Sequence, residues 1–448
     1  MITVLILAYN ELENIKKTVQ GFRLFGDIPI SMVVVDNGST DGLREWIKDQ
    51  TDLTYVYMDE GSMGWAKAIN SVRKELQINT DVLIMEGHYV LTPRYLQRLE
   101  EVLYEDEDIG AVGGVCNEAY YGQMIHGNIH NYKEAVEQAG REMATEGKRA
   151  IMLDHGAILW KKDTLDFIGE FCEKADSMYT VMNDYCLRVV MDGRKLMVCT
   201  NAFLWKLPTE SKNDAFEWEK DVMEEKWGIH YFCSYNESLI QLIENTGNGE
   251  MSVLEIGCAN GGTLAEIKNR YPEAKVYGTE LNAHAAALAA YFAEATVNNI
   301  EDKNLPFHKN MFDYILFGDV LEHLHEPMEI LKYCREFLRE GGCIIASIPN
   351  VMHVSVMEQL MQGNFTYTEY GLLDKTHIHM FTYNEIIRTF YEAGYEIEKI
   401  GSNKIQMRDE QEKLIDSLLS LGNRTERFMY DTFQFVLRAR VRNRKDYE

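Results

Sequence analysis

The sequence of 448 residues contains no run of 18 or more apolar residues, so no transmembrane helix is expected. Its first residues, MITVLILAYNELEN, lack the basic region and the small-residue cleavage site of a signal peptide. We therefore predict that the chain opens with a β-strand. None of the eight cysteines forms a C-x-x-C pair, which argues against a zinc site or a disulfide framework. Scattered cysteines of this kind are typical of a reduced, cytoplasmic protein.

Basic residues are scarce compared with acidic ones. Lysine and arginine total 45 against 71 aspartate and glutamate residues, which gives a formal net charge of −26. Such a charge argues against nonspecific binding to nucleic acid or to anionic membranes. Phosphorylated small molecules are not excluded, because local backbone amides, helix N-termini or a metal can hold them.

The length predicts about two domains, each with its own core. In the first half, four predicted strands alternate with predicted helices over short loops; the strands are Thr3–Ala8, Ser31–Val35, Leu53–Met58 and Asp81–Met85. This alternation is typical of a parallel sheet with helices on both faces. Ligands bind such sheets at the carboxyl ends of the strands. We therefore expect the polar segments 9–11, 36–41 and 86–88 to share one rim.

Five motifs in the first half occur in the order found in inverting family 2 glycosyltransferases of the GT-A fold. They are LAYNELENIKKTV, VVVDNGSTDG, GSMGWAKAIN, HGAILWKKDTLDFIGEF and NDYCLRVVMDGRKL. The resemblance implies that Asp36 bonds the base of a nucleotide-sugar donor and that Tyr9 and Asn10 line the nucleotide pocket. It also implies that Asp184 is the general base that deprotonates the acceptor hydroxyl. Arg188, one helical turn further on, would orient Asp184 or offset its charge.

The chain departs from this family at the metal-binding acid. The family usually has an Asp where this sequence has His88, in Glu86-Gly87-His88, and often has a His near the position of Lys206. Glu86 and His88 could hold Mn²⁺ or Mg²⁺, with imidazole favouring a transition ion. Alternatively, Lys206 replaces the metal as a fixed charge beside the diphosphate, or the domain binds without transferring. We predict weak or absent metal dependence.

We place the domain boundary after residue 228, giving domains of 1–228 and 229–448. Apolar residues at helical spacing predict a helix over His230–Asn245, followed by a turn at 246–250. Next comes VLEIGCANGGT, a buried strand that breaks at Gly257 and continues into a helix after Gly261. Glycines let the backbone turn tightly and approach a ligand closely. Glu280 ends the next strand, where an acid can bind ribose hydroxyls.

The spacing of these glycines is not the G-x-G-x-x-G of dinucleotide-binding proteins. The second half instead resembles class I S-adenosylmethionine-dependent methyltransferases, in the segments VLEIGCANGGT, VYGTELN, FDYILFGDVLEHLHEP, LREGGCIIASIPN and DKTHIHMFTYNEIIRTFYEAGYEI. The resemblance implies a Rossmann-like fold. It places Glu255, Gly257 and Gly261 at the amino-acid end of the cofactor and Glu280 at its ribose.

Two further residues carry implied roles at the same rim. Asn299, predicted at the end of a strand Val297–Asn299, lies where the family often has an Asp that contacts adenine. Asp319 would face the cofactor, although it could equally be the N-cap of a helix that starts at Val320.

Methyl transfer to oxygen needs a group that takes the hydroxyl proton, and histidine titrates in the right range. His323, His353, His377 and His379 are the candidates, and we favour His323 and His377. On a strand, His377 and His379 would point to one face. A metal site from Glu322, His323 and His377 is a second interpretation, which the spacing does not require.

The sequence thus predicts an α/β protein of two domains that is a bifunctional enzyme. The first domain would transfer a sugar from a nucleotide-sugar donor to a hydroxyl of a glycan or glycoprotein. The second would O-methylate that glycan with S-adenosylmethionine. The fusion resembles those that build bacterial surface or flagellin glycans. The alternative is a methyltransferase whose first domain is a degenerate, non-catalytic glycan-binding module.

Overall fold

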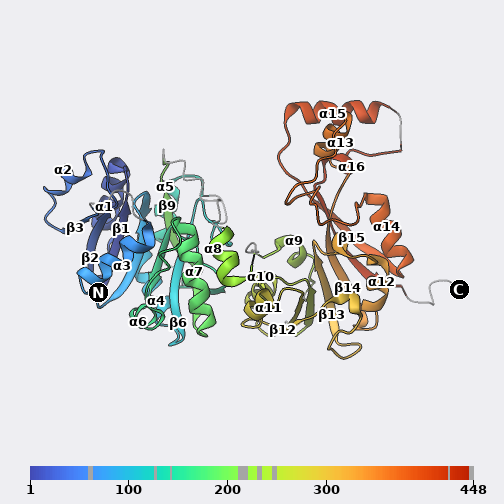
Figure 1. Cartoon of the computed structure of the whole chain (residues 1–448), viewed down its shortest axis with the longest axis horizontal. Coiled ribbons are helices and arrows are strands. Elements are labelled where there is room, and N and C mark those ends of the chain that lie inside the picture. Colours follow the sequence, from blue (N-terminus) through green and yellow to red (C-terminus); the bar gives the residue numbers. More distant parts are fainter. Residues whose placement is uncertain are drawn as a thin grey trace. The chain divides into compact units, whose positions relative to one another are not determined.

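The computed structural model describes residues 1–58, 64–125, 129–141, 144–209, 220–229, 235–244, 250–421 and 424–442. The chain divides into two compact units, Met1–Ser234 and Tyr235–Glu448. Each unit has its own β-sheet and its own hydrophobic core (Figure 1). Most of the turn predicted at 246–250 lies outside the described residues.

The first unit is built on a nine-stranded mixed sheet. Its strands are β1 (Ile2–Ala8), β2 (Ile30–Asp36), β3 (Leu53–Tyr57), β4 (Asp81–Glu86), β5 (Tyr89–Leu91), β6 (Ile109–Cys116), β7 (Gly147–Ala150), β8 (Ala157–Trp160) and β9 (Lys195–Lys206). Their order is β3-β2-β1-β4-β8-β6-β9-β5, with β7 beside β9. The first four strands are parallel, as predicted. β8 runs antiparallel to both β4 and β6.

Strand register brings the predicted polar segments to one rim. In the sheet Ala8 pairs with Asp36, and Leu7 pairs with Glu86. The carboxyl ends of β1, β2 and β4 are therefore neighbours, and the loops that follow them open on the same edge. These strands are almost fully buried, since helices cover both sheet faces.

Helices of the first unit are α1 (Leu12–Phe25), α2 (Leu43–Ile47), α3 (Trp65–Glu75), α4 (Tyr95–Leu103), α5 (Tyr132–Ala139), α6 (Lys162–Ile168), α7 (Met178–Met191) and α8 (Lys220–Trp227). α7 matters most for the site. Its N-cap, Ser177, accepts a hydrogen bond from the Thr180 N–H, which fixes where the helix begins. Most of its residues are buried, including Asn183 and Asp184. A helix this apolar belongs in the core, so two buried polar residues on it need partners.

The second unit has a seven-stranded sheet. Its strands are β10 (Ser252–Ile256), β11 (Lys275–Glu280), β12 (Glu294–Val297), β13 (Phe312–Gly318), β14 (Leu338–Pro349), β15 (Tyr395–Asn403) and β16 (Gln434–Val441). The order is β12-β11-β10-β13-β14-β16-β15. β10 to β14 are parallel, and β16 runs antiparallel between β14 and β15. Ile256 pairs with Thr279 and Phe317, so β10, β11 and β13 end at one rim.

Helices of the second unit are α9 (Glu237–Ile240), α10 (Gly262–Arg270), α11 (Ala283–Ala289), η1 (Ile300–Asp302), η2 (Leu321–His323), α12 (Pro327–Cys334), α13 (Val354–Met361), α14 (Tyr383–Glu392), α15 (Asp409–Ser420) and α16 (Phe428–Asp431). In Figure 1, α13, α15 and α16 lie together, away from the sheet of this unit. Val354, Ile415 and Tyr430 form a small core of their own there.

Two predicted elements differ from the structure. The helix expected over His230–Asn245 is only α9 in its described part, since Asn236 caps it and it ends at Ile240. The apolar spacing instead reflects burial of Leu239, Ile240 and Ile243 in one turn and the loop after it. The strand expected at Val297–Asn299 is β12, which ends at Val297.

The segment that carries His377 and His379 is a loop, so the argument that both would point to one face of a strand does not apply. The N–H groups of Ile378 and His379 both donate to the carbonyl oxygen of Glu322, and the N–H of His377 donates to Asp374. These hydrogen bonds hold the segment against η2. They are not the regular pairing between neighbouring strands that a β-strand requires.

Candidate active sites

The first site lies at the rim of β1, β2 and β4, where two loops are tied together. Asn10, in a left-handed conformation (φ 54°), accepts a hydrogen bond of 2.8 Å from the Thr40 N–H. Its own N–H donates to Ser39 Oγ at 2.9 Å. Asp41 accepts from the Leu12 N–H at 2.6 Å, at the start of α1. The loops after β1 and β2 are thus fixed to each other, which favours a preorganised binding site at this rim.

Asp36 is buried behind these loops. One carboxylate oxygen accepts from the Ser39 N–H at 2.8 Å and the other from the Tyr55 hydroxyl at 2.7 Å. Burial and this bond to Asp36 raise the pKa of Tyr55, so the phenol keeps its proton and stays a donor. The base of a nucleotide could hydrogen-bond to Asp36 either alongside Tyr55 or in place of Tyr55. Tyr9, in contrast, is exposed at the rim, where it can contact a ligand.

A cluster of two acids and two histidines occupies the end of β4. His88 Nδ1 is 3.2 Å from Glu11 Oε2, and His88 Nε2 is 3.6 Å from Glu86 Oε2. His155 Nε2 lies 3.8 Å from the same oxygen of Glu86. Glu86 therefore lies between two imidazoles. His155, which the motif comparison left without a role, belongs to the site.

The charge balance of this cluster favours a protonated His88. Burial acts to lower the pKa of His88, but the hydrogen bond to Glu11 and the charge of Glu86 outweigh it, so the pKa is raised. Lys206 forms an ion pair with Glu118 and is also attracted by the negative charge of Glu86. Two cationic groups, His88 and Lys206, thus act on the same acidic cluster.

Aromatic residues connect His155 to α7. The His155 ring lies against Tyr120 (6.1 Å between centroids) and Tyr179 (5.7 Å). Tyr121 donates to the Tyr179 hydroxyl at 2.6 Å and accepts from Asn183 Nδ2 at 2.9 Å. A wall of rings therefore runs from the β4 cluster to the residue that precedes Asp184. Tyrosine rings present an apolar face together with a hydroxyl, so this surface can offer a ligand both apolar contact and hydrogen bonds.

Asp184 is enclosed by three donors, and its side chain is only 1% exposed. Arg188 Nε donates to Oδ2 at 3.1 Å, which is the predicted contact one helical turn away. Oδ1 accepts from Trp227 Nε1 at 2.9 Å and pairs with Lys226 Nζ at 2.6 Å. Both of these residues belong to α8. A ligand can reach the Asp184 carboxylate only when Trp227 and Lys226 move away from it.

The second site begins at the glycine loop after β10. Gly257 has φ +69°, and a Cβ there would lie 2.6 Å from Val320 Cγ2. Gly261 has φ +83° and would place a Cβ 2.9 Å from Ala289. Neither position tolerates a side chain, because the conformation is left-handed and the space is filled. The loop is thereby kept close to the strand ends.

Glu280 holds this loop, and Glu255 lies beneath it. Glu280 accepts from the Ala259 N–H (2.8 Å) and the Asn282 N–H (2.9 Å). Burial raises the pKa of Glu255 to about 8, and the charge of Glu280 adds to the effect although Thr263 opposes it. Among the described atoms, Glu255 Oε2 is buried with no hydrogen-bond partner. A cationic or N–H-bearing ligand group would satisfy it.

Asp319 and Asn299 occupy the same edge of the sheet. Asp319, at φ 54°, accepts from Gln434 Nε2 at 2.6 Å. The helix after it is η2, whose N-cap is Val320, so Asp319 is not an N-cap. Asn299 is exposed and caps η1 by accepting from the Glu301 N–H at 3.1 Å.

The two histidines that we favour as proton acceptors, His323 and His377, lie close to each other near Asp319. The rings of His323 and His377 are 4.8 Å apart, edge to face. His377 Nε2 is 4.0 Å from Oε1 of Glu322, whose side chain is completely buried. Burial, and then the charge of Asp319, raise the pKa of Glu322 well above its usual value. Burial and the neighbouring His323 lower the pKa of His377, so its imidazole is neutral at physiological pH.

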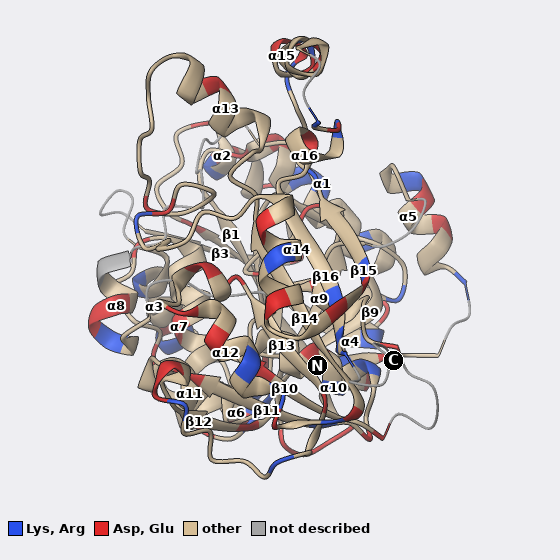
Figure 2. Cartoon of the chain, turned by 90° about the vertical axis from the view of Figure 1, so that its right-hand side faces the viewer, with Lys and Arg blue, Asp and Glu red and all other residues tan. Residues whose placement is uncertain are grey.

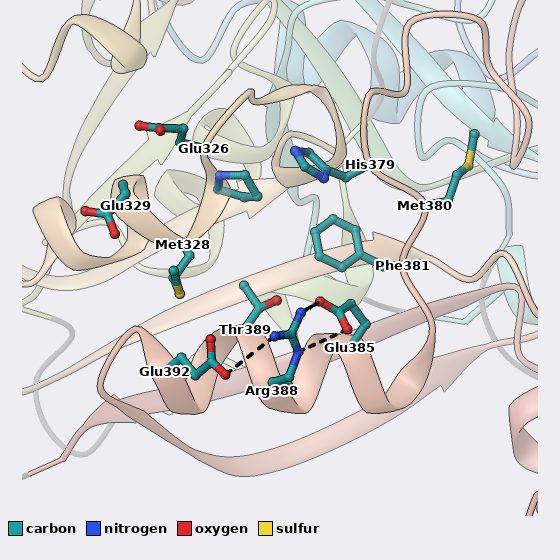
Figure 3. Close-up of a pocket in the computed structure, with 11 residues that line it drawn as sticks. Glu326, Met328, Glu329, His379, Met380, Phe381, Glu385, Arg388, Thr389 and Glu392 are labelled. Carbon is teal, nitrogen blue, oxygen red and sulfur yellow. Dashed lines mark hydrogen bonds and ion pairs between the residues drawn. The ribbon is translucent and has the colours of Figure 1, made fainter.

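A separate pocket of about 500 Å³ opens between α12 and α14 (Figure 3). Met328 and Phe381 line it, and Arg388 is paired there with Glu385 and Glu392. The charges of α14 thus alternate along its exposed face (Figure 2). Of the candidate site residues, His379 lines this pocket, and the two favoured histidines, His323 and His377, do not.

Of the residues that sequence reasoning missed, Glu11, His155 and Trp227 have the clearest place in a site. His155 opens a motif that was used for the resemblance, so its presence there was the available signal. Glu11 follows β1 in the predicted rim. Nothing in the sequence pairs Trp227 with Asp184, because the contact joins segments 43 positions apart.

Two family models match the chain. Residues 3–163 match "Glycosyl transferase family 2", and residues 228–400 match "Methyltransferase domain". With the two sheets described above, these matches confirm the predicted fold class and the predicted fusion. Within the described residues, no helix combines the length and the apolar character needed to cross a membrane.

Curated relatives are similar over limited stretches. A ubiquinone biosynthesis O-methyltransferase of Histophilus somni is 28% identical over 126 residues, covering 26% of this chain and 52% of the relative. One of Cereibacter sphaeroides is 33% identical over 105 residues, covering 22% and 42%. The chain thus spans about half the length, or less, of these relatives.

Solved structures resemble the units only distantly. A mannosyltransferase from Pyrobaculum calidifontis in complex with GDP-Man and Mn²⁺ has a TM-score of 0.36 at 20% identity, covering 48% of this chain and 59% of that one. A SAM-dependent methyltransferase from Aquifex aeolicus has a TM-score of 0.30 at 14% identity, covering 44% and 85%.

Proposed function

We propose that this chain, which joins a family 2 glycosyltransferase domain to a methyltransferase domain, is a bifunctional glycan-modifying enzyme. The first unit transfers a sugar from a nucleotide-sugar donor to a hydroxyl of a glycan or glycoprotein, with inversion. The second unit O-methylates the glycan with S-adenosylmethionine. One observation carries the proposal. Each of the two sheets has polar residues at the carboxyl ends of its strands. The unit that contains each sheet matches a family model, and those polar residues suit the chemistry of that family.

In the first unit, the tied loops after β1 and β2 support donor binding. Tyr9 and Asn10 line the nucleotide pocket in this proposal, and Asp36 bonds the base once Tyr55 shares or yields its position. The ring wall between His155 and Asn183 positions the acceptor sugar. Asp184 takes the proton of the acceptor hydroxyl, and Arg188 positions it.

The leaving diphosphate needs positive charge, and the end of β4 offers two sources. A divalent cation held by Glu86 and His88 is one. Lys206 together with protonated His88 is the other, and the raised pKa of His88 favours it. We therefore propose that sugar transfer depends weakly on metal. Full loss of transfer in EDTA, with recovery on adding Mn²⁺, would contradict this.

In the second unit, the buried, unpartnered Oε2 of Glu255 and the narrow turn at Gly257 and Gly261 fit the amino-acid end of S-adenosylmethionine. Glu280 would hold the ribose. When bound, that cofactor supplies a methyl group on a sulfonium.

Three further residues act around the cofactor in this proposal. Asp319 and Asn299 complete its binding edge. His377, neutral and half-buried beside His323, accepts the hydroxyl proton. The acceptor is proposed as a bacterial surface or flagellin glycan.

Sugar transfer is tested with a matched pair of variants on α7 and its C-cap. Asp184→Asn removes the general base, so we expect sugar-nucleotide turnover to fall by about 10²-fold or more. Asp192→Asn also removes a partner of an arginine, Arg194, but lies at the end of the helix and should leave turnover unchanged. Equal turnover in wild type and Asp184→Asn would overturn the transferase.

S-adenosylmethionine binding is tested by calorimetry on the whole chain. Wild type should bind one equivalent, and Glu280→Gln should bind more weakly by roughly tenfold, since a charge-assisted bond to ribose is lost. The control is Glu273→Gln, an exposed residue of the same unit. No heat of binding in wild type would overturn the methyltransferase.

The second candidate function is a methyltransferase with a non-catalytic first unit. The enclosure of Asp184 by Lys226 and Trp227, together with His88 in place of the family's acid, favours it. In that case the first unit binds a nucleotide-sugar or glycan without turning it over, and Asp184→Asn behaves like wild type.

A further inference from the structure

Glu322, His323 and His377 form a compact group with metal-ligand chemistry. Within the described part of the chain, theirs is the one group of three or more His, Cys, Asp or Glu side chains whose candidate ligand atoms all lie within 4.8 Å of one another. Donors bound to one Zn²⁺ at about 2.1 Å are separated by roughly 3.5 Å. Small side-chain rotations would therefore bring all three onto one ion.

The carboxylate of Glu322 is the observation that most requires an explanation. Its side chain is 0% exposed, and neither Oε1 nor Oε2 has a hydrogen-bond partner. A buried carboxyl group with no partner is costly, and native proteins usually pair such a group or use it to bind a metal. The candidate partners near this carboxylate are imidazole nitrogens, which also bind metal ions.

Each histidine is oriented by a carbonyl oxygen on its far side. His323 Nδ1 is 3.2 Å from the carbonyl oxygen of Thr376, and His377 Nδ1 is 3.3 Å from that of Leu372. A carbonyl can only accept, so we assign the imidazole proton to Nδ1 in both rings. Nε2 then keeps its lone pair, which is how metal-binding histidines are usually oriented.

Backbone bonds hold the three residues together across more than fifty positions. Glu322 and His323 are consecutive in η2. The N–H groups of Ile378 and His379 donate to the Glu322 carbonyl at 2.9 and 3.0 Å, which fixes the loop that carries His377. Preformed geometry of this kind lowers the cost of binding an ion.

From this geometry we propose that Glu322, His323 and His377 bind a divalent transition-metal ion. Two imidazoles and one carboxylate suit Zn²⁺, Mn²⁺ or Fe²⁺ and disfavour Mg²⁺ and Ca²⁺, which prefer oxygen ligands. Three protein ligands leave coordination positions open, as in catalytic rather than structural metal sites.

The place of the site suggests what fills the open positions. η2 follows Asp319 directly, at the rim where we place S-adenosylmethionine. An oxygen of the methyl acceptor is therefore the proposed outer ligand. With His377 bound to the ion, the metal takes over from that histidine the role of activating the acceptor oxygen, and this part alone rests on the proposed function. Metal binding by the three side chains does not depend on it.

The test measures metal directly, on the whole chain. Protein stripped with chelator and desalted is titrated with Mn²⁺, and bound metal is counted by mass spectrometry. Electron spin echo spectra of the Mn²⁺ form report imidazole nitrogen on the ion. We expect wild type to bind at least one Mn²⁺ with a nitrogen signal, and His377→Gln to bind at least tenfold more weakly at this site with a reduced nitrogen signal.

The control is His379→Gln. His379 lies two positions along the same loop, but its Nε2 contacts the His325 carbonyl and lies outside the group. Metal affinity and the nitrogen signal should be unchanged in that variant. Any cation bound at Glu86 and His88 would be present in wild type and in both variants. It therefore does not contribute to the differences between these proteins.

Two outcomes would overturn the proposal. One is wild type without a nitrogen-coordinated ion, which needs no variant and so does not depend on how variants fold. The other is a His377→Gln protein that matches wild type in both measurements. Calorimetry with S-adenosylmethionine on the metal-free chain is run in parallel. Heat from the cofactor, together with a wild type that holds no nitrogen-coordinated ion, would reject the metal site and leave the methyltransferase intact. A nitrogen-coordinated ion without any heat from the cofactor would reject the methyltransferase and leave the metal site intact.

Discussion

At the scale of single residues, both rims contain groups whose protonation is shifted by their surroundings. His88 lies between Glu11 and Glu86, while Glu255 and Glu322 are carboxyl groups buried without adequate partners. Perturbed groups of this kind concentrate in functional sites, although structural networks also produce them. Here they lie at strand ends where ligands bind α/β sheets.

Replacing His88 by Asp should make sugar transfer more dependent on metal. The substitution removes an imidazolium and places a third carboxylate beside Glu11 and Glu86, so the cluster loses its internal positive charge and gains oxygen ligands. We expect Mn²⁺ to stimulate His88→Asp severalfold more than wild type. Initial rates with EDTA and with Mn²⁺ measure this. The exposed histidine variant His130→Asp is the control, and equal stimulation of all three proteins would reject the idea.

Glu255 should make the stability of the second unit depend on pH. Burial raises its pKa to about 8 from an ordinary value near 4.5. The folded state therefore binds this proton more tightly than the unfolded state. The contribution of Glu255 to stability is fully present below pH 4.5 and is lost as pH rises to about 8. Between pH 5 and pH 8.5 the free energy of unfolding should fall by up to about 4 kcal/mol more in wild type than in Glu255→Gln.

Denaturant titrations of the cofactor-free chain at both pH values check this. Glu273→Gln, at an exposed position, should lose stability with pH as wild type does. An identical pH dependence in wild type and Glu255→Gln would show that the carboxyl group is ionised in the folded chain.

At the scale of elements, the sequence predicted the strand ends well and the contacts between them poorly. β1, β2, β4 and β10 are apolar runs that stop at polar or glycine turns, a local pattern that can be read directly. The place of His155 beside Glu86 and of α8 over Asp184 depends on pairs distant in sequence. Backbone bonds to Glu322 determine the loop that carries His377, and no local periodicity encodes them.

Two glycine substitutions can separate the effect of a crowded neighbour from the effect of a left-handed backbone conformation. Gly257 and Gly341 both have left-handed φ values, +69° and +80°, but only Gly257 has a neighbour in the way of a Cβ. Gly257→Ala should cost roughly 1 kcal/mol or more beyond Gly341→Ala, through the clash with Val320. It should also weaken S-adenosylmethionine binding at least tenfold. Adding Val320→Ala should recover part of the stability, and equal costs for both glycines would refute the close approach.

At the scale of the whole molecule, the two units should unfold as separate transitions. All six tryptophans precede residue 228, so tryptophan fluorescence reports the first unit alone. Calorimetry reports both. S-adenosylmethionine at 100 times its Kd should stabilise the second unit by about 2.7 kcal/mol and raise its Tm by several degrees. The fluorescence transition should not move. A shift of both transitions together would mean that the units unfold cooperatively.

The position of β16 has a consequence for how the chain is made. β14 (Leu338–Pro349) gains its second neighbour only when Gln434–Val441 has been synthesised, because β16 pairs between β14 and β15. At about 5 to 20 residues per second, the interval from Pro349 to Gln434 lasts roughly 4 to 17 s. Throughout that time the growing chain carries an unpaired edge that includes Ile344, Ile345 and Ile348. The second half of the protein is therefore exposed to aggregation through this edge until β16 has been made.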